Sequence, residues 1–184
     1  MKLTPLPISG LILIEPRLFT DDRGYFFESY RRDIFLKNGI SDSFVQDNES
    51  RSSRGALRGL HYQIEPFAQA KLVRVLKGKV FDVAVDIRPG SKTFGENFSI
   101  ILDGVKKQML YIPAGFAHGF CALEEGTEFL YKVSNFYSPG HERGILWNDP
   151  DLAIDWPKLD YIISPKDRKF PRLREVFKNA SRER

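Results

Sequence analysis

The chain has 184 residues, enough for one domain with a single sizeable hydrophobic core, and its 42% hydrophobic and 28% charged residues are ordinary for a globular protein. The net charge of +4 allows an anionic ligand, but no basic stripe or nucleic-acid-reading motif accompanies it, so we expect no nucleic-acid partner. No apolar run approaches the ~18 residues that would span a membrane, and the N-terminal run is too short for a signal peptide, so we expect a cytoplasmic protein without a membrane partner.

The first third of the chain is predicted to form short strands, one short helix and a loop. Residues 11–14 and 25–30 are apolar or aromatic runs typical of strands, and a turn sequence at 21–24 separates them. Residues 31–38 are predicted to form a short helix that a glycine ends. The serine- and arginine-rich run SRSSRG at 50–55 is predicted to be a loop.

From residue 71 onward, strand-like runs follow one another at roughly the 8–12-residue spacing of a sandwich or barrel. Turn residues separate these runs, which cover 71–76, 80–88, 98–102, 108–112, 119–123 and 129–137. A charged segment, RLREVFKN at 172–179, is predicted to be helical. We therefore expect a single all-β domain over residues 1–184, with a few short helices and a frayed tail at 178–184.

The run 80–88 alternates between an apolar face and a face that carries two aspartates and an arginine. Such a polar row on a strand usually faces solvent. His61, Lys71 and Tyr131 also lie on predicted strands, however, so we expect Asp82 to face the interior of a barrel whose mouth can hold a ligand.

The segment 45–75 carries the clearest chemical signal. It holds His61, three arginines that precede this histidine, and Lys71 ten residues after it. An imidazole close to several cations is typical of a site that handles a proton next to an anion, because histidine has a reference pKa of ~6.5.

A second histidine, His118, ends the run PAGFAH at 113–118, where a proline and a glycine force a tight turn. This Pro-x-Gly-x-x-His spacing resembles the second motif of the cupin superfamily, small β-barrels of the jelly-roll type. Metal-binding cupins add a His-x-His pair and a glutamate, whereas the run GLHYQ at 59–63 offers one histidine. Cys121 is the only cysteine, which excludes an internal disulfide and a paired-cysteine metal site, and with only two candidate histidines we expect a metal-free site.

Six longer runs make the resemblance specific. They are similar to the dTDP-4-dehydrorhamnose 3,5-epimerase family and read RGYFFESY (23–30), QDNESRSSRGALRGLHYQ (46–63), KLVRVLKGKVFDVAVDIRPGSKTFG (71–95), YIPAGFAHGF (111–120), YKVSNFY (131–137) and ILWNDPDLAIDWP (145–157). The resemblance implies a metal-free cupin that needs no cofactor, forms a homodimer and acts in dTDP-L-rhamnose biosynthesis for bacterial surface polysaccharide. It also implies the reaction, inversion of C3 and C5 of dTDP-4-dehydro-6-deoxy-D-glucose to give dTDP-4-dehydro-L-rhamnose.

The sequence carries the groups that this reaction needs. A ketone at C4 acidifies the hydrogens on C3 and C5, so inversion requires a base on one face, an acid on the other, and a group that stabilises the enolate oxygen. We interpret His61 as the base and Lys71, oriented by Asp82, as the enolate partner. Tyr131 suits the acid, since a phenol stays protonated at neutral pH. The resemblance alone adds Asp167 as the carboxylate that orients His61.

The resemblance also implies substrate contacts, and arginine suits a diphosphate because its guanidinium binds two oxygens at once. The residues that match are Arg23, Glu28, Gln46, Asn48, Arg58, His118 and Glu142, and we add Lys166, next to Asp167, as a further substrate contact. We add Phe26 as a stacking or wall residue, and Tyr137, of the same strand parity as Tyr131, as an aromatic contact.

Arg58 and His61 have opposite parity on a regular strand, yet both should face the substrate. A bulge at Gly59 could re-aim one of the two side chains, or Arg58 could reach the ligand by its length. The sequence leaves both solutions open.

Three other functions are compatible with parts of the pattern. A related epimerase that inverts only C3 or C5 in another deoxysugar pathway would use the same base and acid. A metal-dependent cupin dioxygenase or isomerase would contain stoichiometric metal. A non-catalytic sugar-nucleotide binding module would keep the arginines but should lack the base and the acid.

Overall fold

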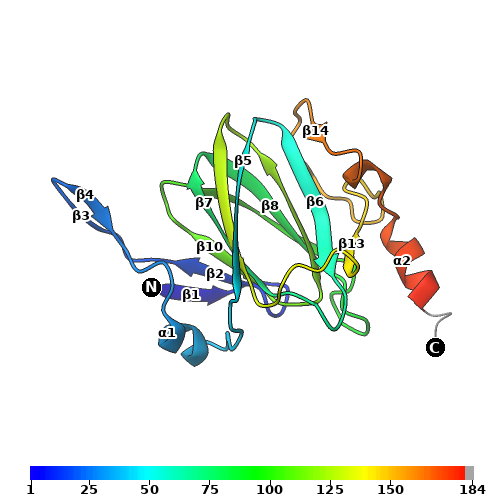
Figure 1. Ribbon diagram of the computed structural model, residues 1–184, viewed down its shortest axis with the longest axis horizontal. Helices are drawn as coiled ribbons and strands as arrows, with labels where there is room; N and C mark the ends of the chain where they lie inside the picture. The colour runs from blue at the N-terminus through cyan, green and yellow to red at the C-terminus, as the bar shows by residue number, and fades with distance from the viewer. Residues whose placement is uncertain (181–184) are drawn as a thin grey trace.

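Two antiparallel β-sheets face each other in the computed structural model, which describes residues 1–180 (Figure 1). The first sheet has the order β1-β2-β10-β7-β12-β5 and contains β1 (Lys2–Pro5), β2 (Ile12–Glu15), β10 (Met109–Ile112), β7 (Lys71–Lys77), β12 (Thr127–Val133) and β5 (Gln46–Ser52). The second has the order β13-β6-β11-β8-β9 and contains β13 (Glu142–Gly144), β6 (Ala56–Gln63), β11 (Phe116–Ala122), β8 (Lys79–Asp86) and β9 (Asn97–Asp103).

The remaining elements are short and lie around the two sheets. They are the strands β3 (Phe19–Asp21), β4 (Gly24–Phe26) and β14 (Ile162–Ile163), the helices α1 (Arg32–Lys37) and α2 (Leu173–Ala180), and the 3-10 turn η1 (Asp167–Lys169). β14 adds to β6 in parallel. The predicted all-β class with a few short helices is confirmed. Neither α-helix of the described chain has the length and apolar character needed to cross a membrane.

Apolar side chains from both sheets fill the space between them. Phe129 comes from the first sheet and Val80, Ala84 and Phe120 come from the second, and all four are buried. Burial of apolar surface, at about 25 cal/mol per Å², is the main force that holds such sheets together. Because side chains alternate along a strand, Asp82 between Val80 and Ala84 is carried into this interior.

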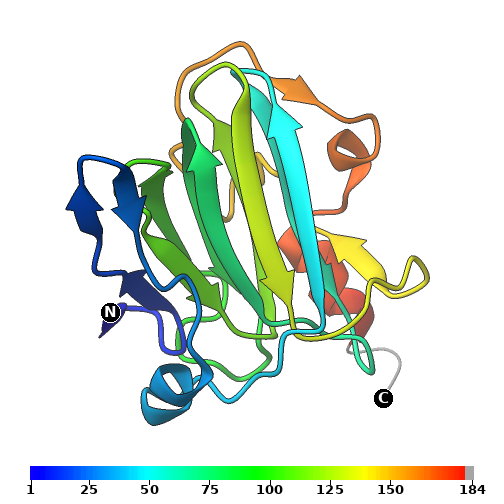
Figure 2. The same ribbon diagram turned by 60° about the vertical axis from the view of Figure 1, so that its left-hand side comes forward.

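The C-terminal part of the chain covers the other face of the second sheet. Val83 of β8 belongs to one buried cluster with Ile145, Trp156 and Leu173. Figure 2 shows this part of the chain, coloured yellow to red, beside β6. Both faces of β8 are therefore buried, and the alternation of residues 80–88 separates two cores rather than a core from solvent.

The strands β3 and β4 form a separate hairpin that extends away from the sandwich (Figure 1). The strand predicted at 25–30 is wrong beyond Phe26, because the chain then folds back onto the first sheet and α1. Phe27 packs under the Arg74 guanidinium and Tyr30 packs against the aromatic ring of α1. The hairpin itself keeps large apolar side chains in solvent, and Phe26 is 66% exposed.

Strand pairing overrides the local sequence at two other predicted boundaries. The loop predicted at 50–55 is wrong for its first half, because β5 pairs with β12 along its whole length as far as Ser52. The strand predicted at 129–137 ends at Val133. Tyr137 therefore lies in an irregular loop and has no strand parity in common with Tyr131.

The ends of two further elements differ from the expectation. β11 begins at Phe116, three residues before the predicted strand, since its pairing with β8 starts there. α2 begins at Leu173 and continues to Ala180, and the tail predicted at 178–184 stays a prediction, since its residues 181–184 lie outside the described chain.

β6 has an irregularity at Gly59 that decides how its side chains point. The two-residue step from His118 to Phe120 on β11 faces the three-residue step from His61 to Arg58 on β6. Gly59 has φ +133°, and a Cβ there would lie 2.5 Å from a Cα of β11, so only glycine fits. The bulge is thus present, and it turns Arg58 and His61 toward the same cavity.

Candidate active site

A cavity of about 700 Å³ opens into the interior of the sandwich, and both sheets line it. Its size is within the range of pockets that bury small molecules. The predicted site residues that line it are Gln46, Asn48, Arg58, His61, Lys71, His118, Tyr131, Tyr137, Glu142, Lys166 and Asp167. The fold therefore brings together side chains from most of the length of the chain.

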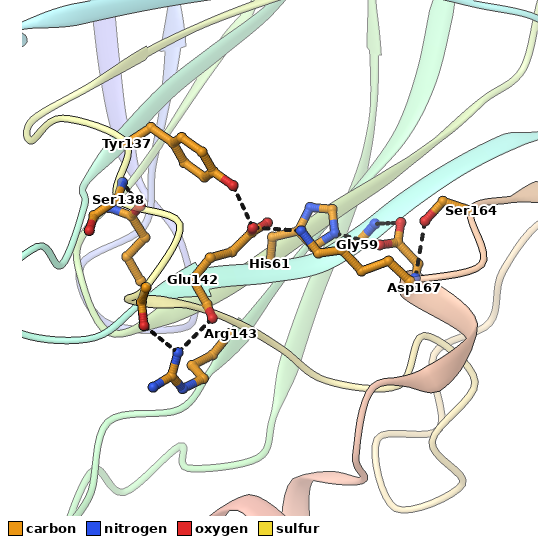
Figure 3. Close-up of polar contacts among 11 residues, drawn as sticks. Gly59, His61, Tyr137, Ser138, Glu142, Arg143, Ser164 and Asp167 are labelled. Atoms are coloured by element: carbon orange, nitrogen blue, oxygen red, sulfur yellow. Dashed lines mark hydrogen bonds and ion pairs between the residues drawn. The ribbon is translucent and has the colours of Figure 1, made fainter.

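His61 and Asp167, 106 residues apart, form a hydrogen-bonded pair in the cavity wall (Figure 3). His61 Nε2 lies 2.8 Å from Asp167 Oδ1. Because an ionised carboxylate only accepts hydrogen bonds, Nε2 is the donor and Nδ1 is left with a free lone pair. Asp167 is itself held by the Gly59 N–H, which donates to Oδ2 at 3.3 Å, and by its own N–H, which donates to Ser164 Oγ at 3.0 Å.

The charge of Asp167 is stable at neutral pH even though the residue is only 4% exposed. Burial raises the pKa of this carboxyl, but the hydrogen bonds from His61, Gly59 and Ser164 more than offset burial and hold the pKa below its ordinary value. Asp167 is therefore a permanent acceptor that keeps the proton of His61 on Nε2.

Lys71 is a buried cation next to this pair. It is 8% exposed, and its Nζ donates to the backbone oxygen of His61 at 3.2 Å. Burial lowers the pKa of Lys71 from 10.5 to about 8, while the charges of Asp82 and Glu142 act in the opposite direction. The ammonium is thus still the main form at pH 7, but it has few partners to neutralise it.

Asp82 forms hydrogen bonds with His118, while its charge also raises the pKa of Lys71, and the predicted orienting role of Asp82 toward Lys71 stays a prediction. His118 Nε2 lies 3.0 and 3.1 Å from the two Asp82 carboxylate oxygens. The strand register explains the contact, because His118 on β11 faces Ala84 on β8 and its ring lies diagonally across from Asp82. Burial lowers the pKa of His118 and outweighs the opposite effect of Asp82, so this imidazole is neutral at pH 7.

Tyr131 reaches the same interior from β12. Its ring packs near that of Phe129, with 6.2 Å between the centroids. Burial raises the pKa of Tyr131 above its ordinary value, and the Arg58 charge only partly opposes this effect. The phenol therefore keeps its proton at neutral pH and can donate it.

Three residues form a polar network at the rim of the cavity (Figure 3). The Tyr137 hydroxyl donates to Glu142 Oε2 at 2.7 Å, and Lys166 Nζ lies 2.5 Å from the same oxygen. Burial raises the pKa of Glu142, but these two bonds outweigh it and lower the pKa below the ordinary value. Because Tyr137 is 51% exposed, the network lies at the solvent-accessible edge of the cavity.

The remaining predicted contacts inside the cavity lie on or beside β5. Arg58 Nε donates to Ser52 Oγ at 3.2 Å, so the guanidinium extends from β6 across to β5. Gln46 donates from Nε2 to Asn48 Oδ1 at 2.9 Å and accepts the N–H of Tyr137 at 3.0 Å. Gln46 thereby connects the strand to the rim.

Arg23, Phe26 and Glu28 lie outside the cavity of this single chain, as far as the described residues show. Arg23 at the hairpin turn pairs with Asp21 at 2.5 Å, and Glu28 lies 3.5 Å from Arg31. The fold thus separates these three predicted contacts from the other predicted substrate contacts.

The sequence matches one family model, dTDP-4-dehydrorhamnose 3,5-epimerase, over residues 5–175. The chain belongs to the dTDP-4-dehydrorhamnose 3,5-epimerase family. An enzyme of that name is an isomerase, so the predicted enzyme class is confirmed together with the predicted family.

Individual relatives of the family agree along nearly the whole chain. The dTDP-4-dehydrorhamnose 3,5-epimerase of Pseudomonas aeruginosa is 58% identical over 171 residues, which cover 92% of this chain and 94% of the relative. A crystal structure of the 3,5-epimerase of Legionella pneumophila in complex with dTDP-4-keto-L-rhamnose has a TM-score of 0.92 and 47% identity, and covers 95% of this chain and 94% of that one. A dTDP-4-dehydrorhamnose 3-epimerase of Streptomyces niveus is 41% identical over 169 residues, which cover 91% and 82%.

Some residues of the epimerase cavity were missed from the sequence. Gln63 and Ser164 line it, and Ser164 supports Asp167. Gln63 lies two residues after His61 on β6, and the two-residue period of a strand could have placed both on one face. Ser164 offers no such signal, since its partner becomes a neighbour only in the folded chain.

No three His, Cys, Asp or Glu side chains within residues 1–180 are grouped so that they could hold a metal ion. His61 and His118 do pair across β6 and β11, but each directs Nε2 to its own aspartate. The expectation that the reaction needs no metal or cofactor stays a prediction.

Proposed function

We propose that this chain inverts C3 and C5 of dTDP-4-dehydro-6-deoxy-D-glucose, with His61 as the base, Tyr131 as the acid and Lys71 as the enolate partner. The observation that carries this proposal is the His61–Asp167 pair beside a buried ammonium in a cavity that also contains a protonated phenol. The product of the two inversions is dTDP-4-dehydro-L-rhamnose.

The first step is proton abstraction next to the ketone. His61 Nδ1 takes the proton from C3, the C–H electron pair forms a C3–C4 double bond, and the C4 carbonyl becomes an enolate. Asp167 stabilises the imidazolium that forms, because its carboxylate already accepts the Nε2–H. Lys71 donates to the enolate oxygen, and such a donor in a water-poor site is worth several kcal/mol, about 3 in comparable cases.

The second step is protonation from the opposite face. Tyr131 delivers its hydroxyl proton to C3, the enolate returns to the ketone, and the configuration of C3 is inverted. The proton on His61 and the phenolate of Tyr131 then return to their starting forms by exchange with solvent. The same sequence at C5 completes the reaction.

Binding of the dTDP part is assigned to the outer half of the cavity. Arg58 and Lys166 are cations that suit the diphosphate, and Tyr137 offers an aromatic surface at the rim. His118, neutral and held by Asp82, has Nδ1 free to accept a hydrogen bond from a sugar hydroxyl. Gln46, Asn48 and Glu142 complete this set.

We also propose that the protein acts as a homodimer, in which the β3–β4 hairpin of one copy contributes to the cavity of the other. Arg23 and Glu28 match substrate contacts of the family and Phe26 is a predicted stacking residue, but all three lie away from the cavity of their own chain. A second copy reconciles these two facts, and it would also cover Phe26 and the other exposed aromatic rings of the hairpin. The cytoplasmic location remains an expectation from the sequence.

The test is proton NMR of the purified protein with dTDP-4-dehydro-6-deoxy-D-glucose in heavy water. The proposal predicts that solvent deuterium enters at both C3 and C5 and that the L-rhamno product forms. Deuterium at C3 alone would select the single-carbon alternative. That alternative is favoured by the relative at 41% identity, which is a 3-epimerase. A protein that folds but exchanges neither hydrogen contradicts both.

A further inference from the structure

The loop that carries Tyr137 depends on side chains for its conformation. Residues 134–141 connect β12 to β13 without forming helix or strand. Backbone N–H and C=O groups of such a loop need partners, or the loop costs free energy where it is buried. Here amide side chains supply those partners, and they decide where the ring of Tyr137 is held.

Gln63, the last residue of β6, bonds to both neighbours of Tyr137. Its Nε2 donates to the Phe136 oxygen at 3.1 Å, and its Oε1 accepts the N–H of Ser138 at 2.7 Å. The same Nε2 also donates to the Phe67 oxygen at 2.6 Å, which ties in the loop after β6. Gln63 is 7% exposed, so each of these three bonds is shielded from water.

The backbone of Gln63 and a second glutamine complete the arrangement. Gln63 pairs with Glu142 in the β6–β13 ladder, and Glu142 accepts the Tyr137 hydroxyl. Gln46 accepts the N–H of Tyr137 itself. Tyr137 is therefore held at its hydroxyl, at its own N–H and on both sides in the chain, and it lines the cavity.

We propose that Gln63 is a positioning residue that sets the affinity for the dTDP part of the substrate by holding Tyr137 at the cavity rim. The inference rests on the proposed function, in which the reacting sugar lies beside His61 and Lys71. The rest of the substrate must then extend toward the exposed rim, where Tyr137 lies. Gln63 shares a strand with His61, so it couples the loop to the element that carries the base without contacting the reacting carbons.

Two variants of Gln63 remove different sets of its three hydrogen bonds. Gln63→Glu keeps the shape and the acceptor for Ser138, but it removes the donors and directs a carboxylate oxygen at two carbonyl oxygens. Gln63→Met keeps the length and removes all three bonds. The matched control is Asn97→Leu, which deletes a single amide-to-carbonyl bond of 2.8 Å to Leu152, away from the cavity.

We expect both Gln63 variants to raise the Kd for dTDP, measured by calorimetry, and the KM for the dTDP-sugar by about tenfold or more, because several buried bonds are lost at once. At saturating substrate, kcat should change by less than about threefold, since the pair of His61 and Asp167 is untouched. Asn97→Leu should lower thermal stability and leave Kd and KM at the wild-type values.

A double-mutant cycle with Tyr137→Ala shows whether Gln63 acts through Tyr137. In that background the proposal predicts no further rise in Kd when Gln63 is changed. Equal rises with and without Tyr137, or an unchanged Kd in the folded Gln63→Glu protein, would overturn the inference. Failure of the wild-type protein to bind dTDP would instead overturn the proposed function, so the two failures are distinct.

Discussion

At the scale of single residues, the cavity concentrates charge that the fold would be more stable without. Lys71 is buried with its ammonium bonded to one backbone oxygen, and burial brings its pKa down to about 8. An unfolded lysine has a pKa of ~10.4, so the unfolded chain binds this proton more tightly than the folded chain does. At neutral pH the buried charge of Lys71 therefore lowers the free energy of unfolding, and the protein keeps this cost because the charge serves the chemistry.

Lys71→Met should therefore stabilise the protein while it removes activity. Because the folded pKa of Lys71 is lower than the unfolded pKa, the free energy of unfolding of the wild type falls as the pH falls from the unfolded pKa through the folded value of about 8. At pH 7, below both pKa values, the full cost of about 3 kcal/mol applies. Urea unfolding at pH 7 should give a higher free energy of unfolding for the variant. Activity of the wild type should fall as pH rises through about 8, because the enolate loses its cation.

Asp167→Asn should lower kcat by about 10²–10⁴-fold with little change in KM, since an amide can donate to Nε2 and leave the wrong nitrogen protonated. Steady-state kinetics measure this change. Asp149→Asn is the matched control, because Asp149 is equally buried and accepts the Leu173 N–H away from the cavity. Equal losses in kcat for the two variants would mean that Asp167 is structural.

At the scale of elements, the strands were predicted best where the apolar alternation in the sequence agrees with the pairing between neighbouring strands. The conflict of parity between Arg58 and His61 left a bulge at Gly59 and a long reach of Arg58 as two solutions, and the structure contains the bulge. The loop at 134–141 could not be predicted, because its partners Gln46 and Gln63 come from 91 and 75 residues away. The sequence of the loop itself does not indicate hydrogen bonds to residues so far away in the chain.

Gly59→Ala should destabilise the protein by about 3 kcal/mol or more, because φ of +133° is strained for any L side chain and the new Cβ meets β11. Thermal unfolding provides the measurement. Gly140→Ala is the control, since a Cβ there has nothing within 4 Å and should change the free energy of unfolding by less than about 0.5 kcal/mol. A Gly59→Ala protein as stable as the control would show that the bulge does not require glycine.

At the scale of the whole molecule, one chain holds a cavity with the proposed base and acid but keeps three predicted substrate contacts on an arm outside it, the β3–β4 hairpin and the residues up to Glu28. Arg23 and Glu28 were predicted from the resemblance to the family and Phe26 from its aromatic character, and neither ground says which copy of the chain these residues serve. The aromatic rings of the hairpin are the physical reason to expect a second copy, because they are costly to leave in water.

A mixing experiment tests this arrangement. Arg23→Glu should weaken the arm and His61→Asn should disable the cavity, so each protein alone should have little activity. If each site combines one arm with the other copy's cavity, refolding an equal mixture should recover about a quarter of wild-type activity, because half of the dimers contain one intact site. Light scattering of the wild type should give the mass of a dimer. A monomeric mass, or no recovery on mixing, would contradict the proposed assembly.

The most direct test of the account compares His61→Asn and Tyr131→Phe in heavy water with saturating dTDP-4-dehydro-6-deoxy-D-glucose. His61→Asn should abolish deuterium entry at both C3 and C5, because no other described group is assigned to remove either proton. Tyr131→Phe should allow exchange to continue with retention while the inverted product forms at least about 10²-fold more slowly. Exchange at the wild-type rate in folded His61→Asn would show that the base lies elsewhere.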